Sequence, residues 1–583
     1  MPEVKVWAPH AERVRLRVSE PGQMEQGPHW TYPMVPAGEG WFAVQAKEAT
    51  EGRDYGFFLG GEEVLFADPR SRRQPEGVHG PSRFWSDRVP WRDAEWAGRS
   101  LEVAVLYELH VGTFTPEGTL DGAIDRLDHL VGLGVTHVEL LPLNDFNGEW
   151  NWGYDGVLWY AVHEAYGGPD ALHRFVEACH ERGLAVVLDV VYNHLGMSGN
   201  CLPAFGPYLK PGTNTWGQLV NLDGESSRPV RDYILDNAVM WLSEFHLDGL
   251  RLDAVHALED RSVPHLLAEL STRVAALEQQ LGRPLSLIAE SDLNDPVTYL
   301  ERGRGGWGLD AQWDDDVHHS LHALLSGERQ GYYGDFGTLA GLAKVWTGAF
   351  LHDGTYSSFR GRIHGKEVDP NTEGWRFVAY LQDHDQVGNR AAGDRLAVKV
   401  PMDLLKVGAV LLLTSPFTPM LFMGEEWAAS TPWPFFTSHP EPELAAAVGK
   451  GRIEEFAEHD WDVSEMIDPQ DPAAFQSAKL LWEERHEGSH GEMLAVYEEL
   501  LRLRREHPEL GAAPLAEVLV DFSEAARWLV VRRGALAVLV NLAEEEQLLA
   551  GSWSAPLFVT ASAETVRDGT FLPPRAAAIV AER

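Results

Sequence analysis

The sequence predicts an α/β protein: a (β/α)8 TIM barrel with a β-sandwich domain at each end of the chain. Between about residues 100 and 510, short apolar runs alternate with amphipathic helical segments, as in parallel β/α folds. Before and after this region, apolar and polar residues alternate in short runs, which is typical of antiparallel sheets. We therefore expect domains at residues 1–92, 93–510 and 511–583.

The two terminal domains are predicted from strand-like alternation. Gly and Pro separate the short runs, and a Pro- and Arg-rich segment at 68–75 follows the first set as an extended connector. Representative runs lie at residues 4–7, 14–18 and 41–44 in the first domain and at 528–531 and 537–540 in the last. Each of the two terminal regions is long enough to form a small β-sandwich.

The central region is read as eight strand–helix units, the number that closes a barrel. The expected strands lie at residues 103–107, 138–141, 185–189, 249–255, 285–289, 309–312, 377–381 and 419–422. Helices are expected at 171–181, 230–245, 262–281 and 491–506. Insertions near 195–229 and 426–490 each follow a strand, so both should cover the catalytic face of the barrel.

Composition excludes several classes of partner. The net charge of −40 repels polyphosphates, so we expect neither nucleic acid nor an anionic membrane as a partner. The only cysteines, Cys179 and Cys201, provide no disulfide framework or metal cluster. No apolar window of about 20 residues and no signal peptide are visible, so the default is a soluble, cytoplasmic protein. We expect a monomer.

Polar residues gather where the expected strands end. Arg251 and Asp253 are two positions apart on strand four, and the Arg would hold the Asp ionised and oriented, as a nucleophile requires. A purely structural ion pair is the alternative for these two residues alone. The segment 189–194, Glu290 and the pair at 384–385 end strands three, five and seven, and such strand ends converge in a barrel.

Two chemistries could use this set of side chains. A divalent metal site would favour a His-Xaa-His pair on the first strand, where only His110 is present. Paired carboxylates without a metal suit glycoside hydrolysis, in which one carboxylate attacks and a protonated one donates to the leaving oxygen. Glu290 follows an apolar strand, where burial would favour the protonated form. We expect no metal and no cofactor.

Four segments carry a resemblance to a known family. Residues 189–194, 249–256, 288–292 and 381–389 resemble the signature regions of the α-amylase family, glycoside hydrolase family 13. The resemblance implies a retaining reaction through a covalent glycosyl-enzyme, with the two reacting carboxyl groups about 5–5.5 Å apart. It also implies a glucan-binding type of N-terminal sandwich.

The same resemblance assigns roles to individual residues. It implies that Asp253 is the nucleophile, Glu290 the general acid/base and Asp385 the stabiliser that grips sugar hydroxyls. The implied substrate-binding residues are Arg251, which orients the nucleophile, His194 and His384, which bind hydroxyls, and Tyr154, which stacks beneath the sugar.

Further motifs narrow the resemblance within the family. Residues 150–157, 166–169, 193–208 and 384–390 resemble those members that cleave the α-1,4 bond beside a terminal trehalose and release it in trehalose biosynthesis. His256-Ala257 stands where plain α-amylases carry Lys-His against the leaving sugar, so His256 is a further substrate-binding candidate. The partners are then the oligosaccharide substrate and its products. A 1,4-α-glucan branching transferase and a non-catalytic glucan-binding relative are the alternatives.

The remaining candidates rest on position alone. Trp216 and Tyr208, in the 195–229 insertion, could stack on sugars or simply anchor the loop. Glu373, just before strand seven, is expected to reach the leaving-group side. Asp383 stands where relatives often have Asn, and we expect it to share a strand face with Asp385. Asn193 is often a calcium ligand in α-amylases, but its insertion offers no partner ligands.

Overall fold

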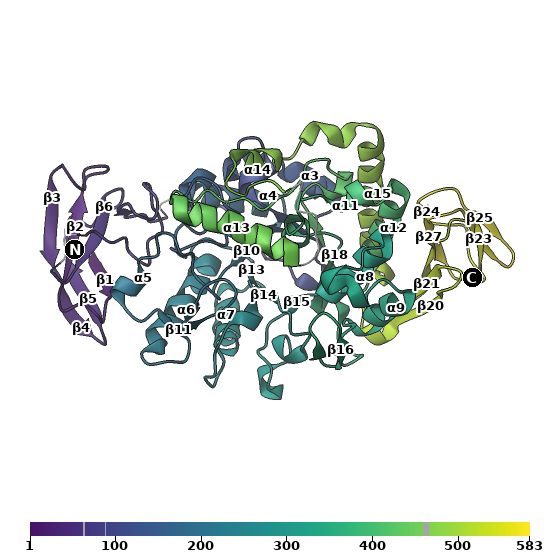
Figure 1. Ribbon diagram of the computed structural model, residues 1–583, viewed down its shortest axis with the longest axis horizontal. Helices are drawn as coiled ribbons and strands as arrows, with labels where there is room; N and C mark the ends of the chain where they lie inside the picture. Colours follow the sequence, from purple (N-terminus) through teal and green to yellow (C-terminus); the bar gives the residue numbers. More distant parts are fainter. Residues whose placement is uncertain (62–63, 88, 459–465) are drawn as a thin grey trace.

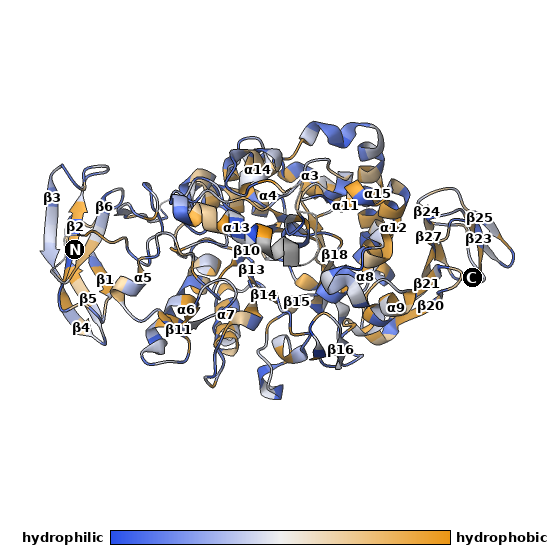
Figure 2. Cartoon of the chain, viewed as in Figure 1, coloured by the Kyte–Doolittle hydropathy of each residue, from blue (hydrophilic) through white to orange (hydrophobic). Residues whose placement is uncertain are grey.

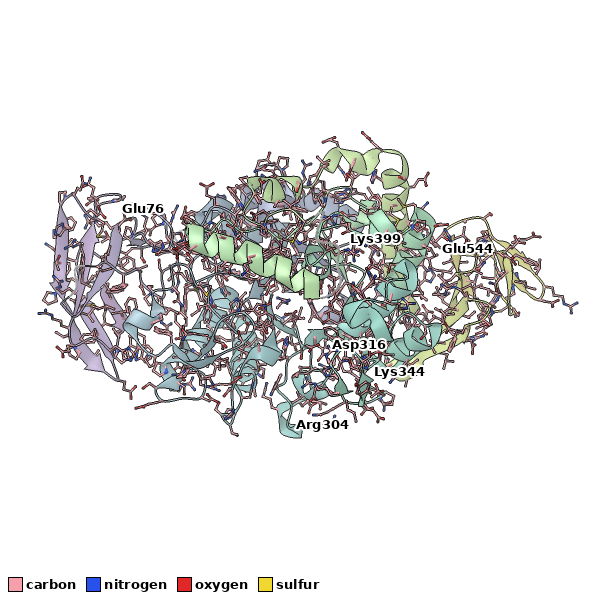
Figure 3. The ribbon with its side chains drawn as sticks, in the orientation of Figure 1. Glu76, Arg304, Asp316, Lys344, Lys399 and Glu544 are labelled. Carbon is pink, nitrogen blue, oxygen red and sulfur yellow. The ribbon has the colours of Figure 1, made fainter. Side chains whose placement is uncertain are left out.

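The computed structural model describes residues 1–61, 64–87, 89–458 and 466–583. Figure 1 shows the N-terminal sheets at one end of the elongated molecule, the barrel in the middle and the C-terminal sheets at the other end. The labelled Glu76 and Glu544 lie toward these opposite ends (Figure 3). The predicted fold class is confirmed, while the domain limits near residues 92 and 510 stay predictions.

Eight parallel strands close the barrel in the order β8, β9, β10, β13, β14, β15, β18, β19. Their bounds are Leu106–Leu109, His137–Leu140, Ala185–Val190, Gly249–Leu252, Ser286–Ala289, Ala311–Trp313, Phe377–Tyr380 and Thr418–Phe422. Every residue of these strands is buried, because helices or loops cover the outside and side chains fill the inside. The register pairs Asp189 with Arg251 and Glu108 with Glu139, so polar side chains of neighbouring strands stand level.

The strand limits differ from the prediction by one residue in most strands and by two or three residues in three of them. Residues 101–103 form a short 3-10 helix, Leu101–Val103, because the side chain of Ser100 caps it. Strand β13 ends at Leu252, and Asp253 begins the turn that follows, where Ala254 adopts φ 40°. Strand β15 begins at Ala311 rather than at residue 309. The apolar runs were read correctly, but hydrogen bonding to neighbouring strands decides where each strand stops.

Helices surround the barrel in the expected places. The main ones are α4 (Gly168–Glu181), α6 (Ser227–Ser243), α7 (Leu266–Leu281), α8 (Asp315–Ser326), α12 (Met402–Leu413) and α15 (Gly488–Glu506). The side chain of Asp314 accepts from a backbone N–H at the start of α8, and Gly282 ends α7 in the left-handed region at φ 69°. Figure 2 shows hydrophobic residues along α12, which packs between α8, α15 and the C-terminal strand β27 (Ala576–Ala581).

Two antiparallel sheets form each terminal sandwich. The N-terminal sheets are β1-β5-β4 (Glu3–Trp7, Trp41–Gln45, Val35–Gly38) and β3-β2-β6-β7 (His29–Pro33, Val14–Ser19, Asp54–Leu59, Ser82–Arg83). One C-terminal sheet has the order β20-β21-β22-β27-β24, with β20, β21, β22 and β24 at Val518–Ser523, Trp528–Arg533, Leu536–Asn541 and Phe558–Val559. The other has the order β23-β26-β25 (Gln547–Ala550, Gly569–Leu572, Glu564–Val566). Apolar side chains between the two C-terminal sheets form a core of their own, whereas those of the N-terminal sheets join the hydrophobic core of the barrel.

Both predicted insertions lie at the carboxyl ends of barrel strands. The first contains α5 (Leu202–Phe205) and the hairpin of β11 (Leu209–Thr213) and β12 (Gln218–Val220). The second contains α13 (Pro442–Glu458) and α14 (Pro472–Ser477), and its residues 459–465 lie outside the described part of the chain. Among the described residues, no helix combines the length and the apolar character needed to cross a membrane.

Candidate active site

The buried side chain of Arg251 is the centre of the site. Its Nη1 donates to Asp189 Oδ2 at 2.6 Å and to Asp253 Oδ1 at 2.8 Å, and its Nη2 lies 3.0 Å from Glu290 Oε2. The guanidinium carbon lies 4.3 Å from the centre of the Trp313 ring. Burial alone would lower the pKa of Arg251, but the surrounding carboxylates raise it well above its usual value. One cation therefore gathers carboxylates from three neighbouring strands.

Asp253 is held through both carboxylate oxygens. Arg251 binds Oδ1, and Asn193 Nδ2 donates to Oδ2 at 2.6 Å and to the backbone carbonyl of Asp253 at 3.1 Å. Its side chain is 12% exposed, so the carboxylate is reachable from the open face of the barrel. The side-chain amide of Asn193 thus orients Asp253, a role that was not predicted from its position as a calcium ligand in α-amylases.

Glu290 lies beside Asp253 on the same guanidinium. Its Oε2 accepts from the backbone N–H of Ala254 at 2.7 Å as well as contacting Arg251. The prediction that Glu290 is buried is wrong, because its side chain is 21% exposed at the mouth of the barrel. Strand β14 is buried, but it ends one residue earlier.

Asp385 lies in a short helix, α10 (His384–Gly388), that follows β18. Asp383 caps this helix, and its Oδ1 accepts from the backbone N–H groups of Asp385 and Gln386, each at 2.9 Å. The prediction that Asp383 and Asp385 share a strand face is therefore wrong, because the strand has already ended at Tyr380. Asn389 Nδ2 donates to Asp385 Oδ1 at 2.7 Å and so fixes one of its oxygens.

His384 is anchored by Glu108, which the sequence analysis did not single out. Its Nδ1 lies 2.5 Å from Glu108 Oε1, and its backbone N–H donates to Oε2 at 3.0 Å. Burial alone would lower the pKa of His384, but Glu108, Asp385 and Asp383 raise it to about 10. The imidazole is therefore a cation at neutral pH. An acidic residue inside an otherwise apolar strand was the available sequence signal for Glu108.

Tyr154 and His194 complete the wall around Asp253. Tyr154 donates from its hydroxyl to Asp189 Oδ2 at 2.6 Å, and its ring stacks on His384 with centres 5.1 Å apart. His194 places Nε2 2.9 Å from the Tyr154 carbonyl and Nδ1 2.6 Å from Asn193 Oδ1. Burial, with Asp253 adding to it and Arg251 opposing it, raises the pKa of Asp189 to about 7. These side chains meet as the sequence predicts.

The open rim of the site carries Trp216 and His256. Trp216 is 46% exposed, and its ring lies nearly parallel to that of His194 with centres 6.1 Å apart. Its edge also faces His256, which is exposed and accepts from the backbone N–H of Asp292 at 3.2 Å. Both side chains remain available to a ligand.

Two candidates do not reach the site. Tyr208 is buried, with its ring 5.1 Å from Trp7 of the N-terminal sandwich and 5.3 Å from Tyr233 of α6. Glu373 precedes β18, at the end of the barrel opposite the site, and its backbone bridges to Pro514. The substrate-binding predictions for Tyr208 and Glu373 are therefore corrected. Tyr208 joins the N-terminal sandwich to helix α6, and Glu373 joins the barrel to the C-terminal region.

In the described ranges, no group of three or more His, Cys, Asp or Glu side chains could hold a metal ion. The expectation that no metal or cofactor is required stays a prediction. What the residues of the site do offer is a set of closely spaced carboxylates oriented by cations and amides, together with aromatic faces, which suits chemistry on a neutral sugar.

Comparison with known proteins identifies relatives over nearly the whole chain. The family model described as the alpha amylase catalytic domain matches residues 76–202, and a model described as a domain of unknown function matches residues 514–579. The chain is 58% identical to a malto-oligosyltrehalose trehalohydrolase of Arthrobacter ramosus, over 92% of each chain. It is 52% identical to one from Rhizobium sp. (strain M-11), over 99% of this chain and 97% of the relative.

Among solved structures, a candidate alpha amylase from Salmonella typhimurium has a TM-score of 0.89 and 36% identity. That likeness covers 100% of this chain and 97% of the other.

Proposed function

Because the chain belongs to the malto-oligosyltrehalose trehalohydrolase family, we propose that it cleaves the α-1,4-glucosidic bond between a maltooligosaccharide and a terminal trehalose. The chain is a glycoside hydrolase of the alpha-amylase type, and oligosaccharides are its class of substrate. The products would be free trehalose and a shortened maltooligosaccharide. One observation carries the proposed chemistry: Asp253 and Glu290 lie against two nitrogens of one guanidinium.

The shared guanidinium supports a retaining reaction in two steps. Asp253 would attack the anomeric carbon while Glu290 gives its proton to the leaving glycosidic oxygen, which breaks that bond and forms a glycosyl ester on Asp253. Glu290, now ionised, would remove a proton from water, and the water oxygen would displace Asp253. Each step inverts the anomeric carbon, so the product keeps the α configuration, and the carboxyl separation for this mechanism is about 5–5.5 Å.

The surrounding side chains would stabilise the positive charge that develops on the sugar ring. Asp385 would grip ring hydroxyls through the oxygen that Asn389 leaves free. The cationic imidazole of His384 can only donate hydrogen bonds, which suits a hydroxyl oxygen as its partner. Tyr154 stacks on that imidazole and offers an aromatic surface to the same sugar.

The trehalose moiety would leave past the rim formed by Trp216 and His256. An exposed indole beside the His256 imidazole matches a leaving group that carries only hydroxyls and apolar ring faces. We further propose that the enzyme works in the cytoplasm as a monomer, without nucleic acid or membrane as a partner. The net charge of −40 supports the exclusion of polyanionic partners.

A product analysis tests the proposal. The protein is incubated with maltotriosyltrehalose and, separately, with amylose, and the products are separated by anion-exchange chromatography. We expect trehalose and maltotriose from the first substrate. New α-1,6 branch points from amylose, with no trehalose from the first substrate, would replace the proposal by a branching transferase. The Asp253→Asn variant serves as the control for contaminating activities.

A further inference from the structure

We propose that Arg452, on helix α13 of the 426–490 insertion, is a positioning residue for Asp385 and acts through Asn389. This inference rests on the proposed function of Asp385 in gripping the sugar. Neither Arg452 nor Asn389 was a candidate from the sequence, and they come from different parts of the chain, one after β18 and one from the insertion.

The contacts form a directed chain of three side chains. Arg452 Nη2 donates to the Asn389 side-chain oxygen and lies 3.4 Å from the Gly388 carbonyl. Asn389 Nδ2 then donates to Asp385 Oδ1 at 2.7 Å, and its own backbone N–H donates to the Asp385 carbonyl at 2.8 Å. The guanidinium carbon of Arg452 lies 4.6 Å from the centre of the Phe435 ring, which supports it from one side.

Arg452 determines which way the Asn389 amide faces. A side-chain amide has one end that accepts hydrogen bonds and one that donates them. Because the guanidinium occupies the accepting end, the donating end must face Asp385. A flipped amide would set its N–H groups against a cation and its oxygen against a carboxylate, so both contacts would become repulsive. Arg452 therefore fixes the orientation of the Asn389 N–H group that donates to the Asp385 carboxylate.

Helix α13 carries this cation across the carboxyl ends of the barrel strands. In the segment that leads into α13, Ser438 accepts from the backbone N–H groups of Glu149 and Trp150, and Glu441 accepts from Ser198 at 2.7 Å. These partners follow β9 and β10, whereas Asn389 follows β18. Figure 1 shows α13 running across the middle of the molecule, in front of the barrel. The packing of α13 over the barrel and the position of Asp385 thus both depend on the side-chain amide of Asn389.

The consequence for the reaction concerns the charged transition state. Asn389 holds Oδ1, and under the proposed function the other oxygen of Asp385 would accept from the sugar hydroxyls. Loss of the amide donor would let the carboxylate rotate, and the hydroxyl contacts that strengthen as charge develops would weaken. The expected defect therefore lies mainly in kcat, with KM little changed.

Asn389→Asp is the decisive variant. The new carboxylate keeps the contact with Arg452 but cannot donate to an ionised Asp385. We expect a folded protein, because the new ion pair with Arg452 offsets the repulsion from Asp385, and a kcat reduced about 10- to 100-fold, since a donor to Asp385 is replaced by a like charge. If the contact between Arg452 and residue 389 serves only stability, this variant keeps its kcat, and the proposal is overturned.

Arg452→Met completes the test, because Met still covers Phe435 but cannot orient the amide. We expect a similar fall in kcat for Arg452→Met and a partial recovery of kcat in Arg452→Lys. The Arg452→Met/Asn389→Ala double variant should have a kcat no lower than that of the slower of its two single variants. Multiplying defects would overturn the proposal. Ile453→Ala, on the next residue of α13 and 47% exposed, is the matched control and should keep its kcat.

The assay uses α-maltosyl fluoride as well as maltotriosyltrehalose. Fluoride leaves without a proton from Glu290, so its release depends on Asp253 and on the groups that grip the reacting sugar. If the wild type releases fluoride but no trehalose, the proposed function fails while the positioning proposal is still tested. If both rates are unchanged in Asn389→Asp, the positioning proposal alone fails.

Discussion

Replacing Arg251 by Lys tests the central geometric argument. The guanidinium contacts Asp189, Asp253 and Glu290 at 2.6–3.0 Å, whereas an ammonium is a single point charge that cannot hold three carboxylates in this arrangement. Suppose that Lys keeps one contact and loses two, each charge-assisted and worth about 1.5–3 kcal/mol. The loss of about 3–6 kcal/mol corresponds to a decrease in kcat/KM of roughly 10²- to 10⁴-fold.

The measurement is kcat/KM for trehalose release, with the melting temperature recorded for the same samples. Arg231→Lys is a matched control, because that arginine is also buried and paired with two carboxylates, Asp260 and Glu269, but none of the site residues contacts it. Both variants should lose stability, and only Arg251→Lys should lose most of its activity. An Arg251→Lys enzyme within about threefold of wild type would refute the reasoning, since a single point charge would then suffice.

Three further outcomes are expected. Asp253→Asn should lower kcat by several orders of magnitude at an unchanged melting temperature, because an amide cannot form the ester; near-normal turnover would mean that the nucleophile is misassigned. Tyr208→Phe and Glu373→Gln should both leave kcat/KM within about twofold of wild type, since neither side chain reaches the site, and a tenfold loss in trehalose release would contradict that placement. The His384 pKa of about 10 lies above its usual value near 6.5, so the protonated imidazole stabilises the fold below about pH 6.5, and this contribution is lost as the pH rises toward 10. Melting temperatures from pH 6.5 to 10 should therefore fall less steeply in His384→Gln than in wild type, and parallel curves would refute the pairing with Glu108.

The parts of the site that could be predicted are those that a strand end presents. Arg251, Asp253, Glu290 and Asp385 follow apolar runs, and parallel barrel strands bring their carboxyl ends together whatever the details of packing. The order of strands and helices was predictable for the same reason: burial requires a continuous apolar pattern that is visible in the sequence. Strand limits were less predictable, because the last hydrogen bond of each ladder depends on its neighbours.

Other features depend on which surfaces meet in three dimensions. Tyr208 and Trp216 lie in the same insertion, and only the folded hairpin shows that one faces the N-terminal sheet and the other the site. Glu373 was misplaced because a residue just before a strand lies at the wrong end of a parallel barrel. Trp313 is indistinguishable in sequence from a core tryptophan, although its ring covers Arg251. Asn389 depends on a contact with α13 that local sequence cannot reveal.

The contacts of the first insertion (residues 195–229) determine how the N-terminal domain can be removed or exchanged in experiments. Tyr208, at one end of the hairpin formed by β11 and β12, packs on Trp7. Asn214, at the hairpin turn, donates to the backbone carbonyl of Asn193. The side-chain amide of Asn193 in turn donates to Asp253. The N-terminal sheets therefore support the hairpin that helps to position Asp253. In a truncated enzyme lacking them, Asp253 would be less well positioned, so any binding of glucan by these sheets has to be tested by substitutions on their outer face. For the same reason, exchanging these sheets between relatives would require the hairpin to be exchanged with them.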